Sequence, residues 1–249
     1  MTESGDYRAR IYRRYSQTHP ARLKAADSLE DQARWFAAQY GPLLPRDKDA
    51  RICELGCGSG AFLWFLKQQG YKNVMGVDQD PGHAAAAREL GLDGVCQGDA
   101  LDFLRKHPAA FDCVVAMDFF EHFRKDELFP LLDLVAAALK DGPGGAAVLG
   151  RVPNADGIAW GRIRCGDLTH ELAFTAGSLH QLFLSAGFSK VEVRPEEPVV
   201  TGLKSGLRWL LWQPMKLALK LYLFAESYSH ADAKLSPNII FRATLGAGD

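Results

Sequence analysis

Hydrophobic and polar positions change their rhythm along the chain near residue 50. Before that point, Trp35, Phe36 and Tyr40 recur at helical spacing. From residue 51, short apolar or β-branched runs alternate with helical stretches of roughly ten to sixteen residues. This alternation is typical of a parallel sheet whose strands are connected by helices. The pattern therefore predicts an α/β fold with a doubly wound, mostly parallel sheet.

Seven runs have the length and composition of strands. They cover residues 51–55, 73–78, 94–97, 111–117, 146–152, 190–194 and 238–245. Helices are predicted over 61–69, from 81 to the stop signal at Gly91, over 125–140 and over 178–186, the last capped by Thr175.

We divide the chain into two parts of one domain. Residues 1–48 form an N-terminal helical cover, in which Ser28 caps a helix that Gly41 stops. Residues 49–249 form the main domain, interrupted by a helical insertion over about 196–236. Pro214 is expected to divide this insertion into the helices 203–212 and 214–227, because proline is tolerated at a helix start.

Charge and composition limit the classes of partner that the protein is expected to bind. Lys and Arg number 29 against 30 for Asp and Glu, a net charge of -1, so no global field attracts nucleic acid. No apolar leader opens the chain, and no run reaches the roughly 18 apolar residues of a membrane span. We therefore expect a cytoplasmic protein without a nucleic-acid partner.

A glycine-rich turn follows the first predicted strand. Gly56, Gly58 and Gly60 allow positive φ and bring backbone N–H groups at a helix start close to a ligand. Asp78 ends the next strand, where a carboxylate can accept hydrogen bonds from ribose hydroxyls. These two features alone also fit a nicotinamide-dependent oxidoreductase.

Four segments in order decide between these alternatives. They are 54–60 (ELGCGSG), 76–80 (GVDQD), 97–100 (QGDA) and 111–118 (FDCVVAMD). With their spacing, residues 50–194 resemble the class I S-adenosylmethionine-dependent methyltransferases. The resemblance implies a Rossmann-like sheet that ends in an antiparallel strand, here 238–245 beside 190–194.

The same resemblance implies the cofactor-binding residues. They would be Glu54, Gly56, Gly58, Gly60, Asp78, Gln79, Asp99, Ala100 and Met117. Glu54 would lie near the amino group of S-adenosylmethionine, Asp78 would bind the ribose, and Asp99 with Ala100 would meet the adenine. Met117 would face the carboxylate and sulfonium. For Asp99, capping of the following helix is the alternative.

Methyl transfer to an alcohol gains from a base or a metal, although alignment is the main requirement. His122 follows the fourth strand in an Asp-x-x-Glu-His run, and His170 lies in the loop after the fifth. The segment 167–175 resembles the D-x-T-H-x-x-x-F-T segment of methyltransferases in saccharide and cell-surface glycan pathways. We expect His170 to be the general base and His122 to be the next candidate, with Asp167 or Glu171 either orienting His170 or joining a metal site.

The expected activity is O-methylation of a small hydroxylated acceptor, a sugar or glycan-linked group. N-methylation of a small amine, an oxidoreductase and a non-catalytic binding protein are the alternatives. No compact set of metal ligands is visible in the sequence, so we assign no metal and leave divalent-metal dependence open.

The insertion carries a local positive charge. Its basic residues are Lys204, Arg208, Lys216 and Lys220, and no acid occurs from 203 until Glu226. Leucines and two tryptophans accompany them, a composition found at membrane interfaces. Residues 203–225 are therefore expected either to touch the inner membrane face or a lipid-linked saccharide, or to form a homodimer contact or a lid.

Overall fold

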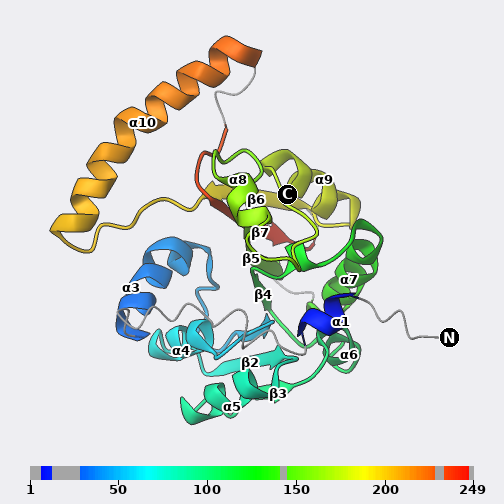
Figure 1. Cartoon of the computed structure of the whole chain (residues 1–249). Helices are drawn as coiled ribbons and strands as arrows, with labels where there is room; N and C mark the ends of the chain where they lie inside the picture. The colour runs from blue at the N-terminus through cyan, green and yellow to red at the C-terminus, as the bar shows by residue number, and fades with distance from the viewer. Residues whose placement is uncertain (1–6, 13–28, 141–144, 228–232, 247–249) are drawn as a thin grey trace.

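The structure is a computed structural model that describes residues 7–12, 29–140, 145–227 and 233–246 (Figure 1). Ser28, the expected N-cap, lies outside these residues. The strands are β1 (Arg51–Leu55), β2 (Asn73–Asp78), β3 (Val95–Gln97), β4 (Cys113–Met117), β5 (Ala147–Pro153), β6 (Lys190–Pro195) and β7 (Asn238–Thr244). They form one seven-stranded sheet in the order β3-β2-β1-β4-β5-β7-β6.

Strand directions confirm the predicted fold class. β1 pairs in parallel with both β2 and β4, whereas β7 is antiparallel to β5 and to β6. Strands β1 and β4 are buried along almost their whole length, as expected for a sheet covered on both faces. The predicted strand bounds differ from the observed ones by two residues at most.

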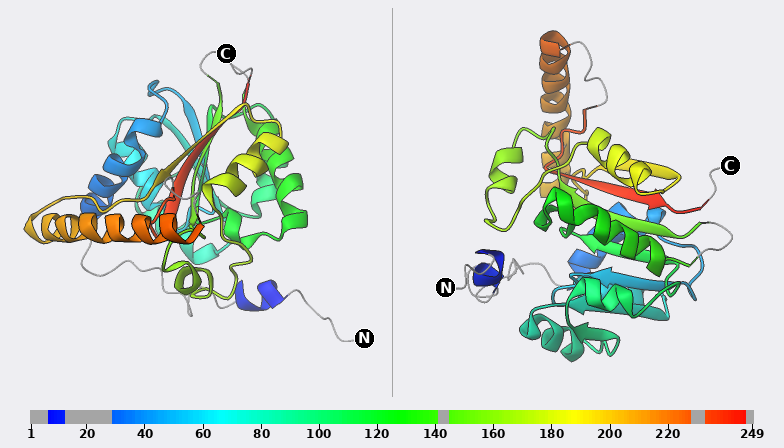
Figure 2. Two further views of the ribbon diagram at one scale, coloured as in Figure 1. Left: turned by 90° about the horizontal axis from the view of Figure 1, so that it is seen from above. Right: turned by 90° about the vertical axis from the view of Figure 1, so that its right-hand side faces the viewer.

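Helices cover both faces of the sheet (Figure 2). One face carries α3 (Leu29–Tyr40), α4 (Ala61–Gln68) and α5 (Pro81–Glu89), and the other carries α6 (Ala100–Arg105), α7 (Lys125–Ala138) and α9 (Ala176–Ser185). The short elements are α1 (Tyr7–Tyr12), η1 (Gly41–Leu43), η2 (Phe120–His122) and α8 (Trp160–Arg164). Thr175 caps α9 through the Ser178 N–H, as predicted.

The insertion contains one helix, α10 (Leu203–Ser227), of 25 residues. The prediction of two helices separated at Pro214 is wrong. Proline in a helix removes the hydrogen bond to the carbonyl four residues earlier, here that of Leu210. Pro214 and Leu210 both lie on the exposed side of α10, where water can reach that carbonyl. In Figures 1 and 2, α10 extends away from the sheet.

The strand order places the site. The chain winds outward from β1 in one direction through β2 and β3, and in the other through β4 and β5. Ligands of open α/β sheets bind outside the carboxyl ends of the strands, where the order reverses. In this sheet that point lies between the ends of β1 and β4, at Leu55 and Met117.

Candidate active site

The turn after β1 has the backbone conformation that its glycines permit. Gly56, Gly58 and Gly60 have φ values of 65°, 53° and 82°. A Cβ on Gly56 would come within 2.9 Å of the Phe119 ring, whereas one on Gly58 would meet nothing within 4 Å. The space beside Gly58 therefore remains open for a ligand that lies against the backbone.

Asp78 ties the end of β2 to this turn. Its Oδ2 accepts a hydrogen bond from the Gly58 N–H at 2.8 Å, and its Oδ1 accepts one from the Asp80 N–H at 2.9 Å. His83 Nδ1 lies 3.4 Å from Oδ1. Each carboxylate oxygen has more than one acceptor position, so Asp78 can hold the turn and still accept from a ribose hydroxyl.

Glu54 places a buried carboxyl group with an unsatisfied oxygen next to the turn. The side chain is buried on β1, and its Oε2 has no hydrogen-bond partner among the described residues. Burial raises the pKa of Glu54 well above its ordinary value, and the charge of Asp78 adds to this increase. A cationic ligand group would remove this penalty, so the site suits the amino group of S-adenosylmethionine.

The residues expected around the adenine lie at the ends of β2 and β3. The Gln97 side chain donates to the Gln79 carbonyl, which places the two strand ends side by side. Asp99 Oδ1 accepts from the N–H groups of Leu101 and Asp102, so it caps α6, which begins at Ala100. Capping, the alternative for Asp99, is thus observed. Contact of Asp99 with adenine remains a prediction.

Both candidate bases come together, although they are 48 positions apart in the sequence. The ring centroids of His122 and His170 are 4.8 Å apart, with an interplanar angle of 70°. His122 ends η2, just after β4, and His170 follows α8. The fold therefore joins the two predicted alternatives into one histidine pair.

Hydrogen bonds determine the tautomer of each ring. Thr169 Oγ1 gives its hydrogen to Asp167 Oδ1 at 2.6 Å, so it accepts from His122 Nδ1 at 2.9 Å. The Nδ1 of His170 faces the carbonyl oxygen of Ile163 at 3.1 Å and must donate to it. In the neutral form, both imidazoles therefore carry their lone pair on Nε2. Asp167 orients His122 through Thr169, whereas orientation of His170 by Asp167 or Glu171 stays a prediction.

Burial keeps the pair uncharged. It lowers the pKa of His122 to about 4, and the neighbouring His170 adds to that decrease. Burial also lowers the pKa of His170, against the opposing charge of Asp167. At neutral pH both rings are thus in the form that can accept a proton or bind a cation.

Glu121 completes a group that the sequence did not reveal. It is fully buried, and neither carboxylate oxygen has a hydrogen-bond partner among the described residues. Burial and the charge of Asp118 raise its pKa well above the ordinary value. One ligand atom each from Glu121, His122 and His170 lie within 4.8 Å of one another. These three residues could hold a divalent cation.

Further contacts on both sides of η2 hold this region in place. Asp118 has φ 50° and is bound by the Arg151 guanidinium, whose Nε donates to Oδ1 at 2.8 Å. On the outer side, Arg8 of α1 pairs with Glu127 at 2.6 Å and donates to the His122 carbonyl. Tyr12 of the same helix lies 6.4 Å from the His122 ring. α1 thus lies against His122.

Glu121, Thr169, Arg151 and Tyr12 were not assigned site roles from the sequence. The Asp-x-x-Glu-His run was the one signal that could have identified Glu121. Thr169 and Tyr12 become neighbours of His122 only through the packing of separate elements.

The doubly wound sheet with its antiparallel last strand and the open glycine turn beside a buried carboxyl group are the fold and site of an S-adenosylmethionine-dependent methyltransferase. The methyltransferase-domain family matches residues 26–193, and the chain belongs to this family. α10 lies beyond the matched residues.

Two curated relatives match shorter segments. The chain is 35% identical over 106 residues to a tRNA U34 carboxymethyltransferase of Actinobacillus pleuropneumoniae, covering 41% of this chain and 33% of the relative. It is 34% identical over 98 residues to a ubiquinone biosynthesis O-methyltransferase of Xylella fastidiosa, covering 37% and 39%. The chain thus spans well under half of the length of each.

Solved structures share the fold. An S-adenosylmethionine-dependent methyltransferase from Archaeoglobus fulgidus has a TM-score of 0.65 at 20% identity, covering 94% of this chain and 99% of that one. Haemonchus contortus phosphoethanolamine N-methyltransferase 2, in complex with S-adenosyl-L-methionine, has a TM-score of 0.63 at 16% identity. This match covers 98% of our chain and 61% of the Haemonchus chain.

Proposed function

We propose that this methyltransferase O-methylates a small hydroxylated acceptor, a sugar or a glycan-linked group, with His170 or His122 as the general base. The histidine pair carries the proposal, because two neutral imidazoles with free Nε2 lone pairs lie beyond the end of β4. The acceptor oxygen would attack the methyl carbon as the carbon–sulfur bond breaks. Its proton would pass to imidazole, and S-adenosylhomocysteine would leave uncharged.

The choice of oxygen over nitrogen follows from the need for a base. An amine with its own lone pair needs mainly alignment, whereas an alcohol gains from proton removal. The Xylella fastidiosa relative is an O-methyltransferase, which supports the same choice. The resemblance of residues 167–175 to glycan-pathway methyltransferases supports a saccharide.

A cavity of about 460 Å³ supports an acceptor that is linked to a lipid. Its lining includes Trp35 and Glu196, and both contact Arg151, the residue that binds Asp118. Its other wall includes Arg208 and Trp212 of α10. The cavity thus connects the neighbourhood of the site with the insertion, and we assign it to the acceptor.

The direct test is an acceptor screen with methyl-labelled S-adenosylmethionine and mass analysis of the products. The panel contains free sugars, lipid-linked saccharides, phenols, small amines and tRNA. We expect label in a saccharide oxygen. Label confined to amines or to tRNA would contradict the proposal.

Single variants test the base. We expect His170→Ala, or His122→Ala if that ring is the base, to lower turnover by about 10²- to 10⁴-fold while cofactor affinity is unchanged. His180→Ala is the matched control, because His180 is exposed on α9. Unchanged turnover in both site variants would leave alignment as the mechanism.

Metal removal separates the two chemical roles of the pair. A base role predicts turnover that survives treatment with EDTA. Turnover that is lost with EDTA and restored by Mn²⁺ would make the imidazoles ligands, with Glu121 as the third.

A further inference from the structure

The apolar side of α10 faces away from the rest of the protein. At about 100° per residue, six of its leucines fall within an arc of about 120°. Their exposed fractions range from 56% to 92%. They are Leu203, Leu207, Leu210, Leu211, Leu217 and Leu221. We call this surface the leucine face.

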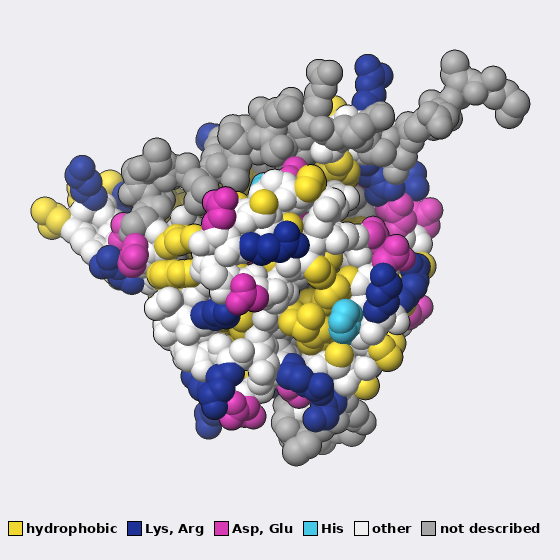
Figure 3. All heavy atoms as spheres, turned by 90° about the horizontal axis from the view of Figure 1, so that it is seen from below, with side chains coloured by type: hydrophobic (Ala, Val, Ile, Leu, Met, Phe, Trp, Pro, Cys, Tyr) yellow, Lys and Arg dark blue, Asp and Glu magenta, His cyan; other side chains and the backbone are white. Residues whose placement is uncertain are grey.

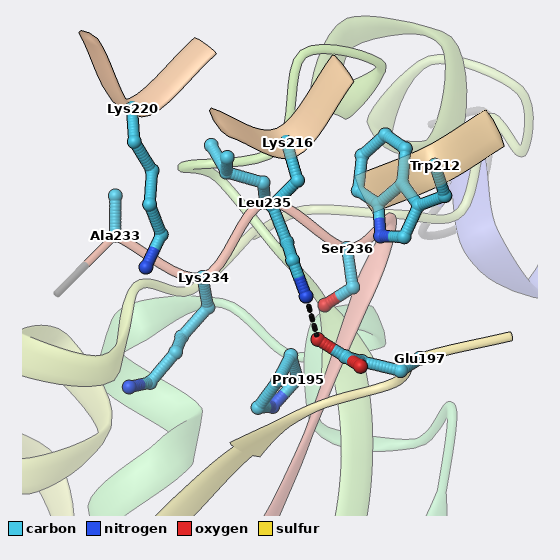
Figure 4. Close-up of a pocket in the computed structure, with 9 residues that line it drawn as sticks. All are labelled: Pro195, Glu197, Trp212, Lys216, Lys220, Ala233, Lys234, Leu235 and Ser236. Atoms are coloured by element: carbon cyan, nitrogen blue, oxygen red, sulfur yellow. Dashed lines mark hydrogen bonds and ion pairs between the residues drawn. The ribbon is translucent and has the colours of Figure 1, made fainter. Parts of the chain in front are cut away.

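The opposite side of α10 is the one in contact with the domain, and it is partly polar. Lys216 is half-buried there, and its Nζ donates to Glu197 Oε1 at 2.8 Å. Trp212 and Lys220 line a cavity of about 140 Å³ together with Lys234 (Figure 4). A helix that covers its own domain has the reverse orientation, with the apolar side inward. The leucine face is therefore built for contact with something outside the described domain.

Exposed basic side chains border the leucine face. On the helical wheel, Lys204 and Arg208 lie along one edge of the arc, whereas Lys220 turns toward the small cavity. Glu226 is the single acidic residue of α10. On the face drawn in Figure 3, by contrast, basic and acidic side chains are interspersed. The positive charge is thus concentrated where the apolar surface is exposed.

This combination selects one occupant. A second copy of the chain docked face to face would bring like charges together, whereas an anionic lipid surface attracts them. Leucines with flanking Lys, Arg and Trp are typical of helices that lie in the membrane interface. Among the described residues, no helix has the length and apolar character needed to cross a bilayer.

We propose that α10 lies in the plane of an anionic phospholipid surface, with the leucine face at the boundary of the acyl chains. The basic residues then sit at the level of the lipid phosphates. Arg208 and Trp212 line the large cavity on the other side of α10, between the helix and the domain. This binding goes beyond methyl transfer and does not require it.

The test is flotation of the full chain with two kinds of vesicle. One is phosphatidylcholine alone, and the other contains about 30% phosphatidylglycerol, an anionic lipid that gives the vesicle a negative surface potential. We expect saturable binding to the anionic vesicles that falls as salt is raised. The double variant Leu210→Glu/Leu217→Glu should bind at least about 30-fold more weakly, since two charges would enter the apolar boundary. Leu184→Glu is the matched control, because Leu184 is an exposed leucine on α9.

Charge variants give a second measurement. Lys204→Gln and Arg208→Gln should each weaken binding by about fivefold, the value expected for one basic residue near an anionic surface. Cofactor affinity reports whether each variant is folded. Equal binding to neutral vesicles would overturn the role of charge. Absence of vesicle binding would overturn the proposal, and self-association lost in the leucine double variant would assign the face to a second copy.

Discussion

Helices α4 and α10 are both rich in large apolar residues, but those of α4 are buried in the core and many of those of α10 are exposed. In α4, Phe62, Leu63, Phe65 and Leu66 are at most 2% exposed. In α10, the leucine face is more than half exposed. Burying one such side chain stabilises a protein by about 1.5–3 kcal/mol. α4 therefore stabilises the domain itself, whereas α10 gains this energy only when another surface covers it.

Position relative to the site adds to this contrast. α4 begins at the glycine turn and its Phe62 packs against Phe36 of α3, with ring centroids 4.9 Å apart. Stability of the core and geometry of the glycine turn are thus coupled at α4. α10 lies outside the family match and touches the site only through the wall of the large cavity. The two helices consequently make different predictions for mutation.

The largest expected effect is on the α4 side of the comparison. Phe65→Ala should lower the free energy of unfolding by about 3–5 kcal/mol, because it leaves a cavity in a fully buried position. Urea denaturation monitored by circular dichroism measures this loss. A change below about 1 kcal/mol would mean that α4 is not an essential part of the core.

Cofactor affinity is expected to respond next. Asp78→Ala should weaken binding of S-adenosylmethionine by about 10- to 100-fold, because it removes the observed hydrogen bond to the Gly58 N–H and the carboxylate that we expect to accept from the ribose. Titration calorimetry measures the dissociation constant. Asp133→Ala, at an exposed position of α7, should leave it unchanged.

The histidine pair predicts an unusual dependence on pH. Because the pKa of His122 is lowered to about 4, the neutral form persists as pH falls through 6.5, where an ordinary histidine takes up a proton. The acid limb of kcat/KM should therefore lie well below pH 6.5, and its midpoint belongs to the pair. Circular dichroism at each pH controls for unfolding. A limb at pH 6.5 would show that the pair is not desolvated.

The smallest expected effect is on α10. Leu210→Ser should change the free energy of unfolding in vesicle-free solution by less than about 0.5 kcal/mol, because this leucine is 60% exposed. The same urea experiment, run beside Phe65→Ala, measures the difference between the helices. A loss above about 2 kcal/mol would place the leucine face inside a folded interface.

Much of the fold could be predicted from the sequence because its signals are local. β-branched runs marked the strands, and residues such as Thr175 and Gly91 marked helix ends. Pro214 misled the prediction, because proline breaks a helix only when the surroundings do not accommodate the lost hydrogen bond.

For the site, motifs gave the residues but not their partners. The sequence could predict that the glycine turn and Asp78 lie close together, because they stand at the carboxyl ends of two strands that are adjacent in one motif. The pairing of His122 with His170, the tautomers set by Thr169 and Ile163, and the unpartnered Glu121 could not. They depend on a loop after β5 folding back over the end of β4.

The sequence by itself determined the doubly wound sheet, the glycine turn and the amphipathic character of residues 203–225. Each of these rests on short-range periodicity or on a contiguous motif. Only the tertiary structure decided that the two histidines form one neutral pair and that the leucine face of α10 turns outward. The physical reason is that periodicity defines which side of a helix is apolar, whereas the packing of distant elements decides what that side meets.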